Sequence, residues 1–397
     1  MNLRRNSLFA AGVLAVCSPL FVSHNIFGST TQPKNEPTTI AVDKGIQWLV
    51  SVQGKDGGWG QDGGETSYVR VGERLESNGN DVANTAVAVQ ALIHAGNTPL
   101  KGEFRNSVAR GIQFILGNVE DSPEQGLAVT RVTGTQIQRK LGPYIDTFLT
   151  SMLLADLDGN MGDAASNARV RSAVQKCVAK IENNQLKDGS WNISGGWAPI
   201  LGTSMASRSL FVAQSKGVKV APVAMAKVEE YTKNNATSGA RGGVAGGRAG
   251  GVLGGVVGGL PAAAGVPLYQ SAQSLEQLSR TPEDRHKNAS AIKAITADLA
   301  SPRFVSGFGS IGGEEFFSYL NVSDSLHRTG GQEWDQWNQK IKTQIVHMQN
   351  DDGTWAGHHC ITGRVAVTGA AILTLLVDRD PVMIPATNRI NKKITKK

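Results

Sequence analysis

Side chains of the kinds that bind metals gather near the C-terminus of this 397-residue chain. His358, His359 and Cys360 follow one another, and Asp351 and Asp352 lie just upstream. Imidazole, thiolate and carboxylate groups are the usual protein ligands of zinc. Adjacent side chains on a helix point in different directions, so the two histidines are not expected to bind one ion as simple neighbours. His358 and Cys360 are therefore candidate metal ligands or catalytic groups, and the alternative is an ordinary helix start.

Carboxylates that act in pairs, as in polysaccharide hydrolases, are the second set of candidates. Asp81, Asp146 and either Glu314 or Glu315 are expected to be able to face a central cavity, and the alternative is a solvated charged face. An Asp just before a helix commonly accepts hydrogen bonds from the free N–H groups that start the helix. Asp81 and Asp146, together with His359, are candidate catalytic residues, and helix capping is the alternative for Asp81.

A phrase repeated three times outlines the elements that must position these residues. QGKDGGW at 53–59, QLKDGSW at 185–191 and QNDDGTW at 349–355 share Gln, Asp, Gly and Trp at the same spacing. The Gly suits the left-handed turn that ends a helix, and the Trp returns a large apolar surface to the helix end. Apolar residues recur at helical spacing before each phrase, and a helix richer in Ala, Val and Leu follows it.

These patterns predict about six pairs of helices, each with a charged outer member and an apolar inner member. The expected pairs are 43–53 with 81–95, 104–117 with 143–157, 168–184 with 202–216, 222–234 with 268–279, 285–299 with 313–321, and 335–349 with 361–377. The fourth and fifth pairs lack the phrase. No segment shows the sustained alternation of a strand. The predicted fold is all-α, an α/α toroid whose inner helices ring a common centre.

The three phrases resemble the QW repeats of squalene–hopene cyclases and of prenyltransferase/squalene-oxidase repeat proteins, in the terpenoid cyclase and protein prenyltransferase-like superfamily. In that family the Gln and Trp tie helix ends together on the outside of the toroid. The resemblance covers roughly 40–380, a single toroid. It implies a structural role for Gln53, Trp59, Gln185, Trp191, Gln349 and Trp355.

The resemblance does not extend to the acid of the class II cyclases. Those enzymes protonate a double bond or an epoxide with the central Asp of a DxDD motif. The matching stretch here is Asp81-Val82-Ala83-Asn84, which keeps the first Asp and has Ala83 at the position of the acid. An alanine cannot donate a proton, so cyclisation by that mechanism is expected to be lost. The aromatic content of 6% is also low for a cavity whose rings stabilise carbocations.

The protein prenyltransferases of the same superfamily hold zinc with Asp, Cys and His. The Asp-x-Cys half of that site is not found here, and apart from Cys17 and Cys360 the remaining cysteine is Cys177. No cofactor is therefore predicted, and whether the chain is an enzyme stays open.

The N-terminus predicts export. Arg4 and Arg5 precede an apolar run that is shorter than the roughly 20 residues needed to span a bilayer. We expect an export signal or a lipid or membrane anchor at 1–28. Cys17, in a stretch similar to a bacterial lipoprotein box, is a candidate for lipidation. The expected location is the periplasm, the cell envelope or the outside of the cell, with attachment to a membrane surface as an option.

The rest of the chain divides into a linker at 29–39, the toroid at 40–380 and a basic tail at 381–397. The formal net charge of +7 comes from the two ends of the chain, so the body offers no basic stripe for nucleic acid. A Gly-rich insertion at 238–267 interrupts the fourth pair. It is interpreted as a mobile loop, with a flap or a small-residue packing surface as alternatives.

The expected function is binding rather than cyclisation. The ligand or partner is an unknown hydrophobic small molecule, a polysaccharide or a protein, bound in the central cavity or on the surface. The alternative is a divergent enzyme that uses the cavity, either a prenyl or terpenoid transferase or cyclase, or a polysaccharide hydrolase or lyase.

Deleting residues 240–262 is expected to leave folding nearly intact, because the excised residues lie within one predicted loop. In the free protein, amides at 242–260 should exchange rapidly with solvent and become protected when a ligand or a membrane surface is bound. Hydrogen exchange measures this directly. Strong protection of 242–260 in the free protein would show that the segment is a packed element.

Overall fold

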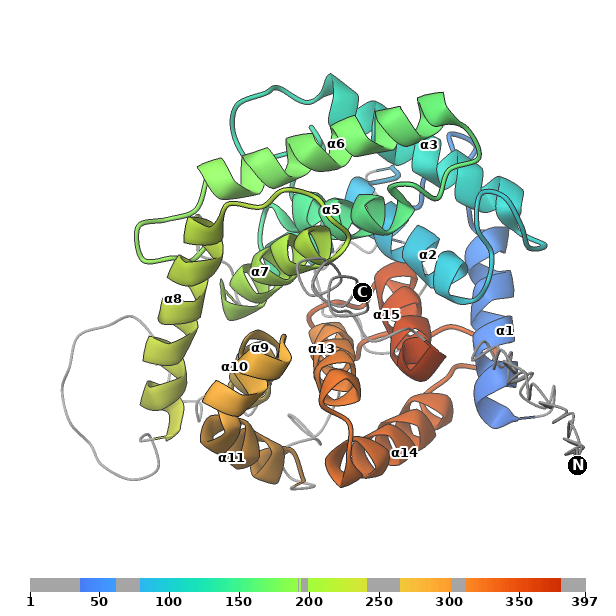
Figure 1. The fold of residues 1–397 in the computed structure, drawn as a ribbon. Coiled ribbons are helices and arrows are strands. Elements are labelled where there is room, and N and C mark those ends of the chain that lie inside the picture. The colour runs from blue at the N-terminus through green and yellow to red at the C-terminus, as the bar shows by residue number, and fades with distance from the viewer. Residues whose placement is uncertain are drawn as a thin grey trace, which may run out of the picture.

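The computed structural model describes residues 36–61, 79–191, 193, 199–240, 265–300 and 312–379. Over these residues the chain is helical, and helices on the outside alternate with helices on the inside (Figure 1). The outer helices are α1 (Pro37–Ser51), α3 (Arg105–Asp121), α6 (Ala164–Asn183), α8 (Pro222–Ala240), α11 (Ala289–Ala300) and α14 (Gln332–His347). The inner helices are α2 (Val82–His94), α5 (Ile145–Leu157), α7 (Pro199–Ser215), α9 (Gly265–Leu278), α13 (Gly313–Thr329) and α15 (Arg364–Leu376).

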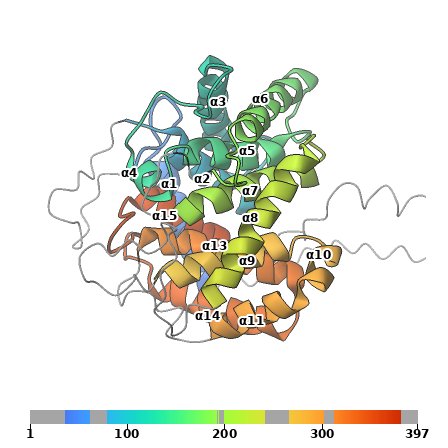
Figure 2. The ribbon, with the colours of Figure 1, turned by 90° about the vertical axis from the view of Figure 1, so that its left-hand side faces the viewer.

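The inner helices form a closed ring. Each contacts the next in the order α2, α5, α7, α9, α13 and α15, and α15 returns to α2. Seen from the side, α3 and α6 cover the inner helices on one edge, and α11 and α14 cover them on the other (Figure 2). Every described side chain of α15 from Val365 to Leu376 is buried, as expected for a helix that packs on all sides. The predicted all-α toroid is confirmed.

The helix boundaries differ from the predicted ones mainly at the ends. α1 begins at Pro37, inside the segment that was expected to be a linker, because proline suits the first turn of a helix and Ala41 and Val42 pack into the core. α13 continues to Thr329, well beyond the predicted end at 321. The expected export signal, the basic tail from 381 and the Gly-rich residues 241–264 lie outside the described residues. Among the described helices, none has the length and apolarity that crossing a bilayer requires.

The tryptophan of each repeated phrase bonds to the outer helix before it and to the inner helix after it. The indole Nε1 donates to a carbonyl in the last turn of that outer helix, at 2.7 Å in all three cases: Trp59 to Leu49, Trp191 to Ile181, and Trp355 to Ile345. Carbonyls at a helix end have no partner within the helix, so the indole supplies the missing donor. The backbone N–H of each tryptophan donates to a threonine of the inner helix, at 2.8 to 3.2 Å: Thr85, Thr203 and Thr368.

The glutamine of each phrase connects neighbouring repeats. Its Nε2 donates to a backbone carbonyl at the start of the next outer helix: Gln53 to Ser107, Gln185 to Ala224, and Gln349 to Ala41. The third of these bonds, at 2.8 Å, joins the last repeat to α1 and so closes the outer layer.

Glycines allow these joints to pack closely. Gly353 has φ +88°, and a Cβ there would lie 3.0 Å from the backbone carbonyl oxygen of Lys44. On α1, a Cβ at Gly45 would lie 2.9 Å from the ring of Trp355, and Gly111 on α3 stands in the same relation to Trp59. The glycines at 45 and 111 therefore make room for the tryptophan ring of the neighbouring repeat.

Replacing Trp355 by Phe should lower the free energy of unfolding by about 1–3 kcal/mol, because the buried carbonyl of Ile345 loses its donor. The matched control is Trp48→Phe on α1, where the ring is only half-buried, and its effect should stay within about 1 kcal/mol. Urea unfolding of the two variants gives the comparison. Equal effects would contradict a special role for the indole at the joint.

Candidate functional site

A pocket on the toroid axis, called here the central pocket, is walled by five of the six inner helices. Its residues are Val87, Gln90 and His94 of α2, Leu149 and Met152 of α5, Met205 and Arg208 of α7, Phe317, Leu320 and Asp324 of α13, Leu373 of α15 and Val377 just beyond it. They recur at spacings of three and four, so each helix presents one face to the axis. Most of the wall is apolar.

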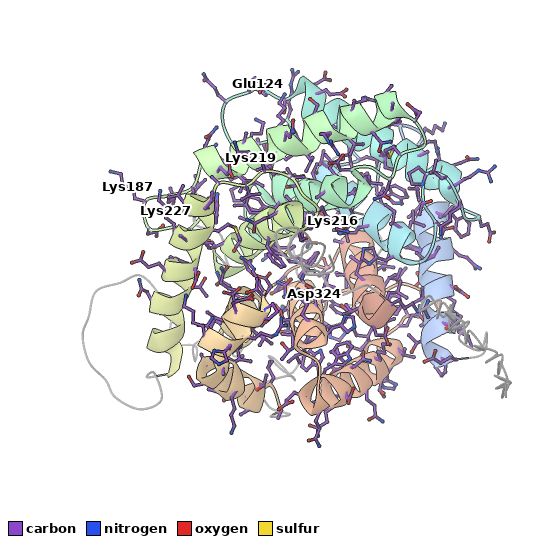
Figure 3. All side chains as sticks on the ribbon, in the orientation of Figure 1. Glu124, Lys187, Lys216, Lys219, Lys227 and Asp324 are labelled. Carbon is purple, nitrogen blue, oxygen red and sulfur yellow. The ribbon has the colours of Figure 1, made fainter. Side chains whose placement is uncertain are left out.

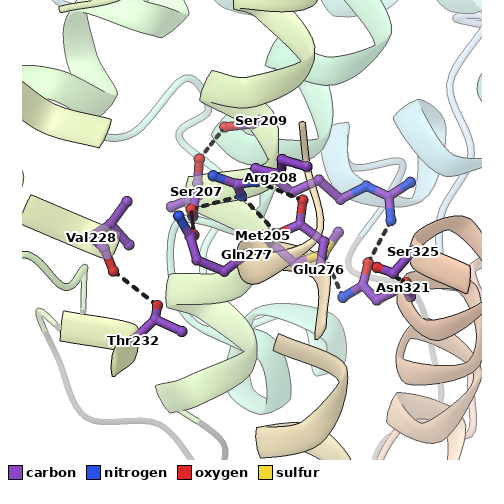
Figure 4. A network of polar contacts seen from close by, with 12 residues as sticks. Met205, Ser207, Arg208, Ser209, Val228, Thr232, Glu276, Gln277, Asn321 and Ser325 are labelled. Carbon is purple, nitrogen blue, oxygen red and sulfur yellow. Dashed lines mark hydrogen bonds and ion pairs between the residues drawn. The ribbon is translucent and has the colours of Figure 1, made fainter. Parts of the chain in front are cut away.

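An ion pair lies at the polar end of the central pocket. Arg208 and Asp324 are 3.2 Å apart, and a further guanidinium nitrogen of Arg208 donates to Asn321 at 2.7 Å (Figure 4). Figure 3 shows Asp324 inside the ring of helices, whereas Lys187 and Glu124 lie at its outer edge. Burial alone would raise the pKa of Asp324, but the charges of Arg208 and Arg328 outweigh burial and hold the pKa below its usual range.

A buried polar network continues behind this ion pair and links α7, α9 and α13 (Figure 4). Arg280 binds Glu276 through two nitrogens, at 3.0 and 2.7 Å, and also donates to Ser207 at 2.8 Å. The guanidinium groups of Arg280 and Arg328 both lie over the ring of Phe211, 5.0 and 5.7 Å from its centre. These ion pairs and aromatic contacts join the three helices to one another.

The carboxylates of Asp81 and Asp146 meet at the first turn of α2. Asp81 accepts from the backbone N–H and the side-chain amide of Asn84, both at 2.8 Å. Asp146 reaches across from α5, accepting the backbone N–H of Ala83 at 3.0 Å and the amide of Gln138 at 2.7 Å. Together the two carboxylates satisfy N–H groups that have no partner within the helix.

Burial makes both carboxyl groups harder to ionise. It raises the pKa of Asp81 from 3.8 to about 6. It raises the pKa of Asp146 to about 7, and the nearby charge of Asp81 adds to the increase. Burial is the larger cause in each case, and the hydrogen bonds only partly oppose it.

A third group of side chains brings α13 together with the segment before α15. Glu314, His359 and Cys360 present ligand-type atoms that all lie within 4.8 Å of one another. His358 is exposed and does not belong to this group. Asp352, expected to lie near a metal, instead accepts from the backbone N–H of Thr354 at 3.1 Å and shapes the turn.

Several residues of these clusters were not predicted. Gln136 accepts the backbone N–H groups of Thr362 and Gly363, each at 2.9 Å, and so holds the start of α15 against α4 (Gln136–Leu141). The Arg208–Asp324 pair was also missed. No local pattern marks these residues, because their partners are far away in the sequence.

Replacing Asp146 by Asn should flatten the dependence of stability on pH. Because the folded pKa is raised above the ordinary value, the stabilising contribution of Asp146 is complete below about pH 4 and is lost as the pH rises through about 7. Over this interval the free energy of unfolding of the wild-type protein should fall by on the order of 2–4 kcal/mol more than that of the variant.

Urea unfolding from pH 4 to pH 8 measures this difference. Asp121→Asn, an exposed position on α3, is the matched control and should keep the wild-type profile. An unchanged profile in Asp146→Asn would contradict the assigned protonation of the buried carboxyl.

Known proteins resemble this chain in sequence and in fold. Residues 23–140 match the family model of the squalene-hopene cyclase C-terminal domain. A squalene–hopene cyclase from Bradyrhizobium diazoefficiens is 35% identical over 75 residues, which is 19% of this chain and 10% of that enzyme. The chain therefore aligns with about a tenth of the length of this curated relative.

Among solved structures, two variants of the type II terpene cyclase MstE from Scytonema are similar. One is in complex with the product merosterolic acid A and the other with the substrate geranylgeranyl dihydroxybenzoate. Each is 11% identical with a TM-score of 0.49, over 86% of this chain and 96% of that one. Residues 23–140 are thus similar in sequence to squalene-hopene cyclases, and over the described residues the chain forms an all-α toroid of outer and inner helices.

Proposed function

We propose that this protein binds an apolar ligand in the central pocket and does not cyclise it by the class II mechanism. The observation that carries the proposal is the pocket itself, whose mainly apolar wall is assembled from five inner helices and whose volume of about 40 Å³ would have to widen by side-chain movement to admit a ligand. A concave, mainly apolar site with a few convergent polar groups is the common form of a small-molecule site. The polar groups that would orient such a ligand are Gln90, His94, Arg208 and Asp324.

The side chains around Ala83 support binding without protonation. Ala83 lies four residues before Val87, on the face of α2 that lines the central pocket, and it is fully buried. The neighbouring carboxyl oxygens of Asp81 and Asp146 accept hydrogen bonds from the start of α2, from Asn84 and from Gln138. A general acid must present its proton to the substrate, and these oxygens are committed to the helix.

The alternative is a divergent enzyme with a displaced acid. Asp146 favours it in one respect: its Oδ1 lies 3.0 Å from the backbone nitrogen of Ala83, beside the position of the missing acid. With a pKa raised to about 7, a large share of this carboxyl would be protonated near neutral pH. A polymeric ligand or a protein partner outside the pocket is the second alternative.

We also propose that the protein is exported. The basic residues and the short apolar run at the N-terminus support transport to the periplasm, the cell envelope or the outside of the cell. An apolar ligand would then be met at or near a membrane surface, where lipid-anchoring through Cys17 would hold the protein.

Mass spectrometry of organic extracts tests ligand binding. Protein purified from its own host should carry an apolar compound in near-stoichiometric amount, and Met152→Trp should lose it because the larger ring fills the central pocket. Met225→Trp, at a half-buried position on the outer helix α8, is the control and should retain the compound. A compound retained in Met152→Trp and lost in Met225→Trp would place the ligand elsewhere.

Incubation with squalene or oxidosqualene tests the chemistry. No cyclic product is expected, because alanine stands at the acid position. A cyclic product that persists in Asp121→Asn and disappears in Asp81→Asn or Asp146→Asn would favour the displaced-acid enzyme instead.

A further inference from the structure

We infer that Glu314, His359 and Cys360 form a binding site for a thiophilic divalent cation of the zinc type. Glu314 lies in the first turn of α13, and the other two residues lie in the segment that leads into α15. The site belongs to the ends of two neighbouring inner helices and is separate from the ion pair at Asp324. The inference does not depend on the proposed apolar ligand.

The geometry of the three side chains is close to that of a metal centre. Their ligand atoms all lie within 4.8 Å of one another, and Nδ1 of His359 is 3.2 Å from Sγ of Cys360. A tetrahedral zinc with bonds of about 2.3 Å to sulfur and about 2.0 Å to nitrogen separates these two atoms by about 3.5 Å. Small side-chain rotations would therefore bring all three ligands to bonding distance.

Glycines bring the two backbones to this distance. A Cβ at Gly357 would lie 2.2 Å from the backbone nitrogen of Gly313, so only glycine fits between the segments. The N–H of Gly313 donates to the carbonyl of His359 at 3.3 Å, and this bond joins the two ligand-bearing segments. Cys360 has φ +61°, the left-handed region that residues with a side chain seldom adopt. Strained backbone of this kind is concentrated at binding and catalytic sites.

The carboxylate of Glu314 is the independent indication that a cation binds. The side chain is fully buried, with 0% exposure. Both of its oxygens lack a hydrogen-bond partner among the residues that the structure describes. A buried carboxylate without a partner is costly, and charges in such places are normally paired or coordinate a metal.

The ligand types indicate which cation fits. Thiolate and imidazole favour zinc and related metals, whereas magnesium and calcium prefer oxygen ligands. Three protein ligands leave a fourth position for water or for another molecule, as in zinc sites that act on a substrate. Glu314 precedes Phe317 of the central pocket by three residues on α13, which places it on the same helix face and toward the opposite end from Asp324.

Cobalt(II) gives a direct test, because thiolate coordination produces an absorption band. The full chain, treated with chelator under reducing conditions, should bind one cobalt per molecule with a thiolate-to-metal band, and zinc should displace it. Cys360→Ser should lose the band and bind zinc more than about 100-fold more weakly, since changes in outer-shell partners alone cost about 10–100-fold.

Two variants serve as matched controls. His358→Ala removes the exposed neighbouring imidazole, and Cys177→Ser removes a buried thiol on α6; both should bind cobalt like the wild type. A band that survives in Cys360→Ser would overturn the inference. So would retention of binding in His359→Ala with loss in His358→Ala.

The variant Glu314→Gln distinguishes loss of metal binding from loss of folding. The amide keeps the shape and removes the charge, so the metal-free variant should melt at the wild-type Tm or above it. Zinc should raise the Tm of the wild type and leave that of Glu314→Gln unchanged. Equal stabilisation of both proteins by zinc, or no cobalt binding by the wild type at millimolar metal, would contradict the site.

Discussion

The hydrogen bond from a tryptophan indole to the last turn of an outer helix is the contact on which this toroid depends. It satisfies a carbonyl that a helix end leaves without a partner, and it fixes the ring of the tryptophan between an outer helix and its inner neighbour. The glutamine of the same phrase then binds the next outer helix. In the third copy this next helix is α1, so Gln349 and Trp355 join the two ends of the described chain. The axis and its pocket exist only because the ring is closed.

The two ends of the inner helices also differ in how their charged groups are arranged. Acidic side chains lie at the N-terminal ends of three of them, Asp81 at α2, Asp146 at α5 and Glu314 at α13, where the positive end of the helix dipole favours them. Toward the other end the arginines are paired with carboxylates: Arg280 with Glu276, and Arg208 and Arg328 with Asp324. The central pocket therefore borders a set of buried ion pairs.

The sequence predicted the helices much better than the site. The helix pairs could be predicted because the spacing of apolar residues and the repeated phrase are both local signals. For the pairs that contain α9 and α13 the phrase is absent, and the spacing of apolar residues alone indicated the helices. Asp81 was recognisable as a helix cap by its place before an apolar run. In contrast, the approach of Glu314 to Cys360 depends on two inner helices becoming neighbours, and no local pattern records it. The sequence likewise does not reveal that His359, and not His358, lies beside Glu314 and Cys360.

The same limit explains why Ala83 could be interpreted and Asp146 could not. Ala83 departs from the DxDD motif, whose four positions are adjacent in the sequence. The role of Asp146 comes from its reach across to the N–H of Ala83 on another helix, and its raised pKa comes from burial, which the sequence does not reveal.

A crystal structure of the protein purified from its own host, with no ligand added, tests most directly whether function resides on the axis. Continuous density for an apolar molecule is expected between Phe317 and Leu373, with its polar end toward Arg208 and Asp324. Density for such a molecule on the outer helices, with the axis filled by rearranged side chains, would contradict the account.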